Sequence, residues 1–205
     1  IAISCAPNMG SEDKIGWNIP VESAKINNVF VITLEKQRSA IEKYLREHEL
    51  KNIRFYYVDI PSIYKKIYSG FLFSGRLNVW HRRALRVARE ICQKENIQII
   101  HQITPVEFRS IGRYGSIPNV KFVCGPLAGG QKTPKELLGY TGIYRTVEWL
   151  RNFTNKCVRL VYRITGKLKQ CDYLWFANNE TSAFLQVCKS VDQDCEILPD
   201  VSIGK

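Results

Sequence analysis

Residues that could bind or transform a ligand gather in short segments that each follow an apolar run. The first segment, PNMGSEDKIGWN (7–18), contains Gly10, Ser11, Glu12, Gly16, Trp17 and Asn18. Its glycines would let the backbone approach a ligand closely. A helix beginning near Trp17 would offer free N–H groups and the positive end of its dipole to a phosphate. The spacing matches neither the dinucleotide-binding fingerprint nor the P-loop, so an ordinary turn with Trp17 packed in the core explains it equally well.

A histidine marks the end of another apolar run. His101 lies in IQIIHQI (97–103), and Thr104 and Pro105 follow it. An imidazole at the carboxyl end of a central strand can contact a ligand hydroxyl or act as a general base. A hydrogen-bonded histidine with a purely structural role is the commoner occupant of such a position.

The segment CGPLAGGQ (124–131) is rich in glycine and also follows an apolar run. Its turn-forming residues are Gly125, Pro126, Gly129 and Gly130. This glycine density permits a turn whose backbone amides face a ligand, although a plain irregular loop fits the same residues. Charged residues near predicted strand ends are more often on the surface than catalytic, and here they are Glu107, Arg109, Glu180 and Asp200.

A long basic stretch, 144–169, has two faces at helical spacing. One face carries the cations Lys156, Arg159, Arg163 and Lys167. The other face carries the apolar residues Phe153, Cys157, Leu160, Val161, Ile164 and Leu168. A helix of this kind can lie in a membrane interface, with the cations facing the lipid headgroups. It can equally pack its apolar face on a sheet and leave a solvated basic back.

The elements that must position these residues alternate along the chain. Short β-branched or aromatic runs predict strands at 1–6, 28–34, 53–60, 97–103, 120–125, 173–178 and 195–199. Amphipathic helices are predicted within 37–50 and 81–96. This alternation predicts an α/β, Rossmann-like fold with a mostly parallel sheet of about seven strands and helices on both faces. Ligands of such sheets bind beyond the carboxyl ends of the strands, which is where the three segments lie.

Composition narrows the class of protein. The chain has 205 residues, of which 45% are hydrophobic, so it can bury a core as one globular domain, or as one domain and part of another. Its net charge of +11 favours an anionic partner, such as nucleic acid, an acidic membrane surface or a phosphorylated ligand. The seven cysteines show no C-x-x-C pair, so we expect neither a disulfide framework nor a metal, and a reducing cytoplasmic setting fits best. No apolar run approaches the length of about eighteen residues that spans a bilayer.

Seven segments share an order and spacing with one enzyme family. They are GSEDKIGWN, VFVITLEKQRSAIEKYL, NIRFYYVDIP, IQIIHQITPVEFRSIG, VKFVCGPLAGGQKTP, CDYLWFANNET and CEILPDVSIG. Together they resemble the N-terminal, acceptor-side domain of glycosyltransferase family 4 enzymes of the GT-B fold. The likeness extends from Ile3 to Gly204 and is closest to a bacterial subgroup whose first loop reads G-S-E-x-x-x-G-W-N.

The resemblance implies transfer of a sugar from a nucleotide diphosphate sugar to a glycan or lipid-linked acceptor, usually with retention and without a cofactor or required metal. It implies that the first segment lines a cleft between two Rossmann-like domains, that His101 lies beside the transferred sugar, and that the glycine-rich segment and Thr104 line the same cleft. It also implies work at the cytoplasmic membrane face. Stretches 144–169 and 61–80 could then dock on anionic lipid.

The chain departs from the family pattern in three ways. Ala128 replaces a glycine and Gln131 replaces an acid of the glycine-rich turn. The motifs of the donor-binding C-terminal domain are missing, so we expect one domain of a two-domain enzyme that is inactive by itself. Two alternatives remain: a non-enzymatic binding module for nucleic acid or an anionic surface, and a GT-B relative that binds or epimerises nucleotide sugars. Nucleic acid is not expected, because the cations are scattered and no known motif is present.

Overall fold

The computed structural model describes residues 1–7, 9–67, 73–134, 136–137, 142 and 144–198. Its strands are β1 (Val29–Leu34), β2 (Ile53–Val58), β3 (Ile99–Gln102), β4 (Lys121–Leu127), β5 (Tyr173–Phe176) and β6 (Asp194–Ile197). Its α-helices are α1 (Ser11–Ser23), α2 (Arg38–Glu47), α3 (Ser62–Ile67), α4 (Phe73–Lys94), α5 (Tyr144–Thr165) and α6 (Asn179–Leu185). Short 3-10 helices are η1 (Glu35–Gln37), η3 (Tyr114–Ser116), η5 (Lys167–Gln170) and η6 (Gln186–Cys188).

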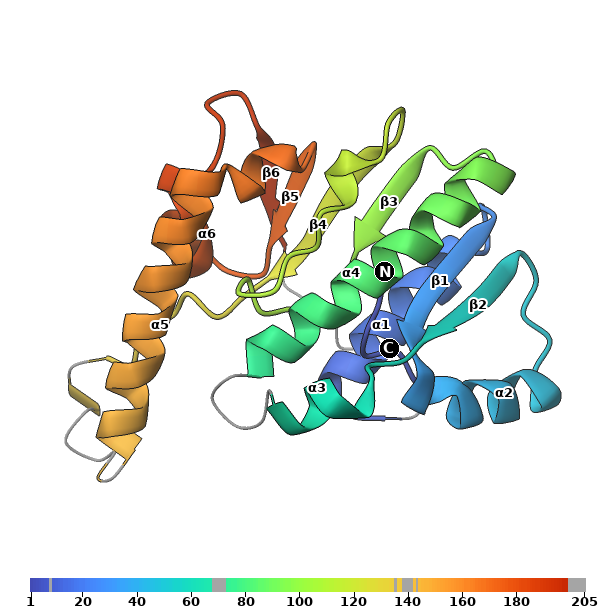
Figure 1. Ribbon diagram of the computed structural model, residues 1–205, viewed down its shortest axis with the longest axis horizontal. Coiled ribbons are helices and arrows are strands. Elements are labelled where there is room, and N and C mark those ends of the chain that lie inside the picture. The colour runs from blue at the N-terminus through green and yellow to red at the C-terminus, as the bar shows by residue number, and fades with distance from the viewer. Residues whose placement is uncertain (8, 68–72, 135, 138–141, 143, 199–205) are drawn as a thin grey trace.

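The strands pair in parallel, as the alternation of strands and helices predicted, but they form two sheets where one was predicted. β1 pairs with β2, and a second sheet has the order β3-β4-β5-β6. The strands succeed one another across the molecule, with α5 at the far side of the four-stranded sheet (Figure 1). The fold is therefore α/β with parallel strands, which is consistent with a Rossmann-like arrangement.

The prediction of about seven strands was too high, because the described part of the chain contains six. Segment 1–6 forms no regular strand; it lies between the sheets, where Ala2 donates to the Ile32 carbonyl (2.9 Å) and Ile103 donates to the Ile1 carbonyl (2.8 Å). Thr104 Oγ1 accepts from the Ser4 amide and donates to the Ser4 carbonyl, both at 3.0 Å. The ladder of backbone hydrogen bonds stops at Ser4, because the Thr104 hydroxyl bonds both the N–H and the carbonyl of that residue.

Helices cover both faces of the β1–β2 pair. Val31 packs in one cluster with Trp17 of α1 and Ile41 of α2, whereas its neighbour Ile32 packs in another with Trp80 of α4. Because successive residues of a strand point to opposite faces, α1 and α2 lie on one side and α4 on the other. Figure 1 shows α4 crossing in front of the strands. This packing aims the N-terminus of α1 and the loops after β3 and β4 at the same edge.

The first helix begins earlier than predicted. It starts at Ser11, with Gly10 as its N-cap, and not near Trp17. Glu12 and Asp13 then lie in its first turn, where acidic side chains are stabilised by the positive end of the helix dipole. Most of the segment predicted as a ligand-facing loop is thus helical, and this decides which of its side chains can reach a ligand.

Candidate functional site

The candidate site lies at the edge formed by the carboxyl ends of β3 and β4 and the N-terminus of α1. Glu12 of α1 reaches the loop after β3, where its carboxylate accepts a hydrogen bond from the Val106 amide at 2.8 Å. Burial raises the pKa of Glu12, the Val106 N–H offsets part of that shift, and the charge of Glu107 raises it further. Glu12 therefore joins two of the predicted segments, and a carboxylate with a raised pKa is suited to hold or transfer a proton.

The other predicted residues of the first segment divide into two groups. Gly10, Ser11 and Asn18 are exposed on α1. Trp17 is 6% exposed, stacks on Phe55 with ring centroids 5.6 Å apart, and meets the edge of Tyr44 at 5.1 Å. Trp17 is thus a core residue in this structure, which matches the packing interpretation and not the predicted cleft position.

Gly16 has a packing role as well. A Cβ on this glycine would lie 1.9 Å from the Ser4 carbonyl oxygen, so only glycine lets α1 approach segment 1–6 this closely. Thr104 is fully buried against Ser4, with its hydroxyl already engaged, and is not free to contact a ligand. Gly16 and Thr104 therefore support the edge of the site by packing, and neither of them faces a ligand.

His101 lies on β3 and turns toward β4. Its Nε2 is 2.7 Å from the Gly125 carbonyl oxygen, and its ring lies 6.1 Å from that of Trp175. Burial lowers the pKa of His101 to about 4, so the imidazole is neutral at pH 7, donates through Nε2 and keeps its lone pair on Nδ1. A neutral ring can accept a hydrogen bond from a hydroxyl, but it cannot offer a positive charge to a phosphate.

The glycine-rich segment is a turn whose amides are already bonded within the protein. Ala128 donates to the Val106 carbonyl at 2.8 Å, Gly129 to Gln131 Oε1 at 3.1 Å, and Gly130 to Thr181 Oγ1 at 3.0 Å. An anion would have to displace a side chain, such as that of Gln131, to reach them. The predicted turn is therefore present, but its amides do not point freely at a ligand.

The glycines of this turn are explained mainly by close packing. A Cβ on Gly125 would meet the Trp175 carbonyl oxygen at 2.2 Å, and one on Gly130 would meet the Cα of Thr181 at 2.7 Å. Gly125 and Pro126 are buried. Gly129 has φ +96, in the left-handed region that favours glycine, and its Cβ position is only in ordinary contact with Phe108.

Residues from α5 complete the site. Asn155 is 2% exposed; its Nδ2 donates to the Gly129 carbonyl at 3.0 Å, and its Oδ1 accepts from Arg109 Nη1 at 3.1 Å. Arg109 also bonds Glu107 through Nε and Nη2, at 3.1 and 2.7 Å. A half-buried ion pair and an amide thus fix the turn at Gly129.

A second α5 contact holds the end of the same turn. Arg151 donates to the Gln131 carbonyl at 2.9 Å and forms a two-point pair with Glu148, at 2.9 and 2.7 Å. Hydrogen bonds from Arg151 hold the pKa of Glu148 at about 2, so this carboxylate stays ionised and the pair stays intact at neutral pH.

Sequence reasoning missed the α5 contribution. Glu107 and Arg109 were expected on the surface, but they are half-buried and pair with each other. Asn155 lies midway between Arg151 and Arg159 at a spacing of four residues, so the sequence could have placed these three on one helix face. Nothing in the sequence shows that this face turns toward Gly129. Asp200, another of the charged residues noted near strand ends, lies outside the described residues.

The four predicted membrane-facing cations do not share one surface. Lys156 and Arg163 are exposed. Arg159 lies against Phe184, 4.8 Å from its ring, and Lys167 lies 5.3 Å from the ring of Tyr162. Burial lowers the pKa of Lys167, and the charge of Arg113 lowers it further. Arg159 and Lys167 therefore face the body of the protein and not its surroundings.

The exposure of the apolar residues on α5 contradicts one of the two expectations for this helix. Phe153, Leu160, Val161 and Ile164 are exposed, whereas Asn155 and Tyr162 are buried. The interpretation in which the apolar face packs on the sheet beneath a basic back is therefore wrong. The helix buries its polar contacts to the glycine-rich turn instead. The aromatic stretch 61–80 falls partly outside the described residues, and only Ile63 and Tyr64 of α3 are described there as exposed large side chains.

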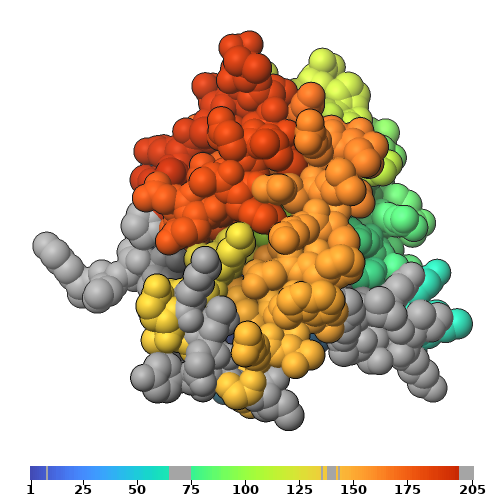
Figure 2. All heavy atoms as spheres, turned by 90° about the vertical axis from the view of Figure 1, so that its left-hand side faces the viewer, coloured from blue at the N-terminus to red at the C-terminus, as the bar shows by residue number. Residues whose placement is uncertain are grey.

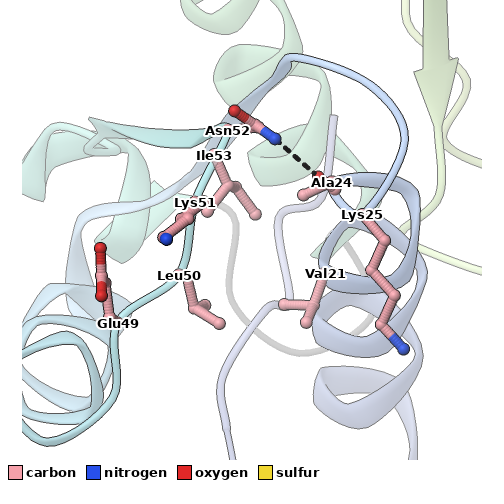
Figure 3. Close-up of a pocket in the computed structure, with 8 residues that line it drawn as sticks. All are labelled: Val21, Ala24, Lys25, Glu49, Leu50, Lys51, Asn52 and Ile53. Carbon is pink, nitrogen blue, oxygen red and sulfur yellow. Dashed lines mark hydrogen bonds between the residues drawn. The ribbon is translucent and has the colours of Figure 1, made fainter.

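Two hollows of the described surface open mainly toward the amino ends of the strands. One, of about 370 Å³, is bordered by the last turns of α1 and the start of β2, where Asn52 donates to the Ala24 carbonyl at 3.4 Å (Figure 3). The other, of about 660 Å³, runs along β1 and β3, and its lining includes His101. Shape alone would favour these hollows. The converging carboxylates, arginines and turn amides favour the carboxyl edge, where parallel α/β sheets bind ligands.

Comparisons of the chain with protein-family models, with curated proteins and with solved structures gave no match. Within the described residues, no group of three or more His, Cys, Asp or Glu side chains is placed to hold a metal ion. None of the helices described is both long and apolar enough to cross a membrane.

Proposed function

We propose that this chain is the acceptor-side, Rossmann-like domain of a GT-B glycosyltransferase that moves a sugar from a nucleotide diphosphate sugar to a glycan or lipid-linked acceptor. The observation that carries the proposal is the way the predicted segments meet. Glu12, the loop after β3 and the turn at Gly129 converge at one edge through the Val106 and Ala128 backbone bonds. The resemblance in motif order supplies the chemistry.

Strand order supports a Rossmann-like core. If segment 1–6 is counted between the sheets that it bonds, the order is β2-β1-(1–6)-β3-β4-β5-β6. If segment 1–6 is counted as the first strand along the chain, the strands follow the order of a doubly wound sheet. The direction in which the chain adds strands to the sheet reverses between segment 1–6 and β3. Ligands bind at such a switch point, and Glu12 bridges it.

Each part of the site has a role in the proposed transfer. Exposed Gly10 and Ser11 at the start of α1 offer the positive end of a helix to the donor diphosphate. Neutral His101 accepts a hydrogen bond from a sugar hydroxyl through Nδ1. Glu12 takes up or returns the proton of the acceptor hydroxyl, because burial raises the pKa of its carboxyl toward neutral pH. The donor nucleotide binds a second domain, so we propose that this domain has no transferase activity by itself.

The test begins with the coding region downstream of Lys205. A second α/β domain with acidic donor-binding residues supports the proposal, whereas a different kind of domain contradicts it. The complete gene product is then incubated with radiolabelled nucleotide diphosphate sugars and membrane or glycan acceptors. We expect transfer that Glu12→Gln lowers by about 100-fold, a typical contribution of a general base.

Lys14→Gln is the matched control, because Lys14 is exposed on the same helix and the change is also a single charge removal. Transfer should persist in this variant. Sugar transfer by the 205-residue chain alone, or full activity of a folded Glu12→Gln enzyme, would contradict the assignment.

A further inference from the structure

The outer side of α5 carries an apolar stripe that no described element covers. Trp149, Phe153, Leu160 and Ile164 are 65%, 53%, 56% and 75% exposed. Their spacings of four and seven residues place them on one side of the helix. The rings of Trp149 and Phe153 stack with centroids 5.8 Å apart. Figure 2 shows α5, in orange, lying open along this face of the molecule.

Cations border the stripe along one flank. Arg145, Lys156 and Arg163 are exposed, and a rotation of about 100° per residue puts them in one row beside the apolar residues. The single acidic residue of α5, Glu148, is paired with Arg151 on the inner side. The outer face of α5 is therefore apolar and cationic without a compensating acid, on a chain with a net charge of +11.

We propose that the outer face of α5 docks in the headgroup region of a lipid bilayer that contains anionic lipids. Trp149, Phe153, Leu160 and Ile164 enter the boundary between headgroups and acyl chains, and the cation row contacts the anionic headgroups. Charge complementarity selects this occupant: a second copy would bring the same cations and the same lack of acid to the interface, and like charges would repel. Arg159 and Lys167, which face the body of the protein, take no part.

The inner side of the same helix holds the candidate site. Asn155 bonds Gly129 and Arg151 bonds Gln131, so docking of the outer face sets the glycine-rich turn one helix diameter from the lipid surface, a distance of about 10 Å. We therefore infer that the acceptor is linked to a lipid. This inference about the acceptor rests on the proposed function, whereas the docking of α5 does not.

The first experiment is co-sedimentation with vesicles, which needs no nucleotide sugar and so separates docking from transfer. Vesicles of phosphatidylcholine alone are compared with vesicles that also contain phosphatidylglycerol. We expect binding to the mixed vesicles that weakens as salt rises. Lys156→Glu with Arg163→Glu should weaken it at least about 30-fold, since each cation near an anionic surface contributes about a factor of five.

Lys43→Glu with Lys51→Glu is the matched control. Both lysines are exposed away from α5, and the net charge changes by the same amount, so binding should fall much less. Equal loss in both double variants, or equal binding to vesicles of phosphatidylcholine alone, would overturn the proposed role of the cation row.

The second experiment tests insertion of the stripe. Trp149 emission should shift to the blue on adding mixed vesicles, and the shift should disappear in Trp149→Phe. Trp17 and Trp80 are already buried, and Trp175 lies on β5, outside α5, with its Nε1 bonded to the Leu198 carbonyl. Phe153→Ala with Leu160→Ala should weaken vesicle binding at least about tenfold. Ile26→Ala with Val191→Ala is the control, since both residues are exposed elsewhere at 87% and 100%.

Two results would show that the outer face of α5 binds a partner other than a membrane. If the stripe variants leave vesicle binding unchanged and convert a dimer into a monomer in light scattering, the face binds a second copy. If nucleic acid competes for the cation row and vesicles do not bind, the face binds nucleic acid. Either result overturns the proposal.

Discussion

Asn155 shows how a single buried amide organises the candidate site. It donates to the Gly129 carbonyl and accepts from Arg109, which in turn pairs with Glu107. The loop after β3, the turn after β4 and α5 are thereby joined through one side chain. Since a buried polar group left without its partner is costly, the three elements hold one arrangement.

Replacing Asn155 by alanine should lower the free energy of unfolding by about 2 kcal/mol, because it strips partners from the half-buried Gly129 carbonyl and from Arg109. The measurement is a urea unfolding curve. Lys156→Ala is the control on the same helix; its side chain is exposed, so the loss should stay within about 0.5 kcal/mol. Similar losses in both variants would show that the Asn155 network adds nothing to stability.

At the scale of elements, the position of α1 depends on contact with segment 1–6. Gly16 touches the Ser4 backbone, while Thr104 ties that same backbone to the end of β3. Trp17 locks the helix from its other side against Tyr44 and Phe55. These contacts fix where the first turn of α1, and with it Glu12, meets the Val106 amide.

Gly16→Ala should therefore cost about 3 kcal/mol or more of unfolding free energy, because the new Cβ meets backbone at 1.9 Å and α1 must shift. Gly10→Ala is the matched control at the N-cap of the same helix, where φ is −59 and nothing lies within 4 Å of the new Cβ. It should cost less than about 1 kcal/mol. Thermal unfolding of the two variants measures both, and equal stability would contradict the close packing.

For the molecule as a whole, two buried histidines link folding to pH. His81 bonds the Tyr114 hydroxyl at 2.9 Å, and burial lowers its pKa to about 3. His101 bonds Gly125, and burial lowers its pKa to about 4. Both rings take up protons much more readily in the unfolded chain, where the ordinary pKa is 6.5.

The free energy of unfolding should consequently fall as the pH drops below 6.5. At these two rings unfolding binds up to two protons that the folded protein excludes, so the rings contribute a slope of up to about 2.7 kcal/mol per pH unit between pH 6 and pH 4. Urea unfolding at a series of pH values measures it. His101→Gln should remove about half of the slope, and a flat profile for the unaltered protein would show that the rings are not held neutral.

Much of the fold could be predicted from local sequence. Patterns such as VFVITL and IRFYYV are short, β-branched and bounded by polar residues, and they form β1 and β2 as expected. Segment 1–6 has the same pattern but lacks a regular ladder, because a side chain 100 residues away, Thr104, takes the backbone groups of Ser4. The start of α1 was misplaced because a glycine such as Gly10 can end a loop or cap a helix, and in the structure Gly10 caps α1.

The sequence by itself determined the alternation of elements, the helical spacing of α5 and the gathering of polar residues after strands, because these depend on neighbours along the chain. Only the tertiary structure decided that Trp17 is buried, that the turn amides are occupied, and that α5 turns Asn155 inward and Phe153 outward. A helix with two faces that could each pack buries the face for which the folded chain supplies partners. For α5 those partners are Gly129 and Arg109, which only the folded chain brings beside it.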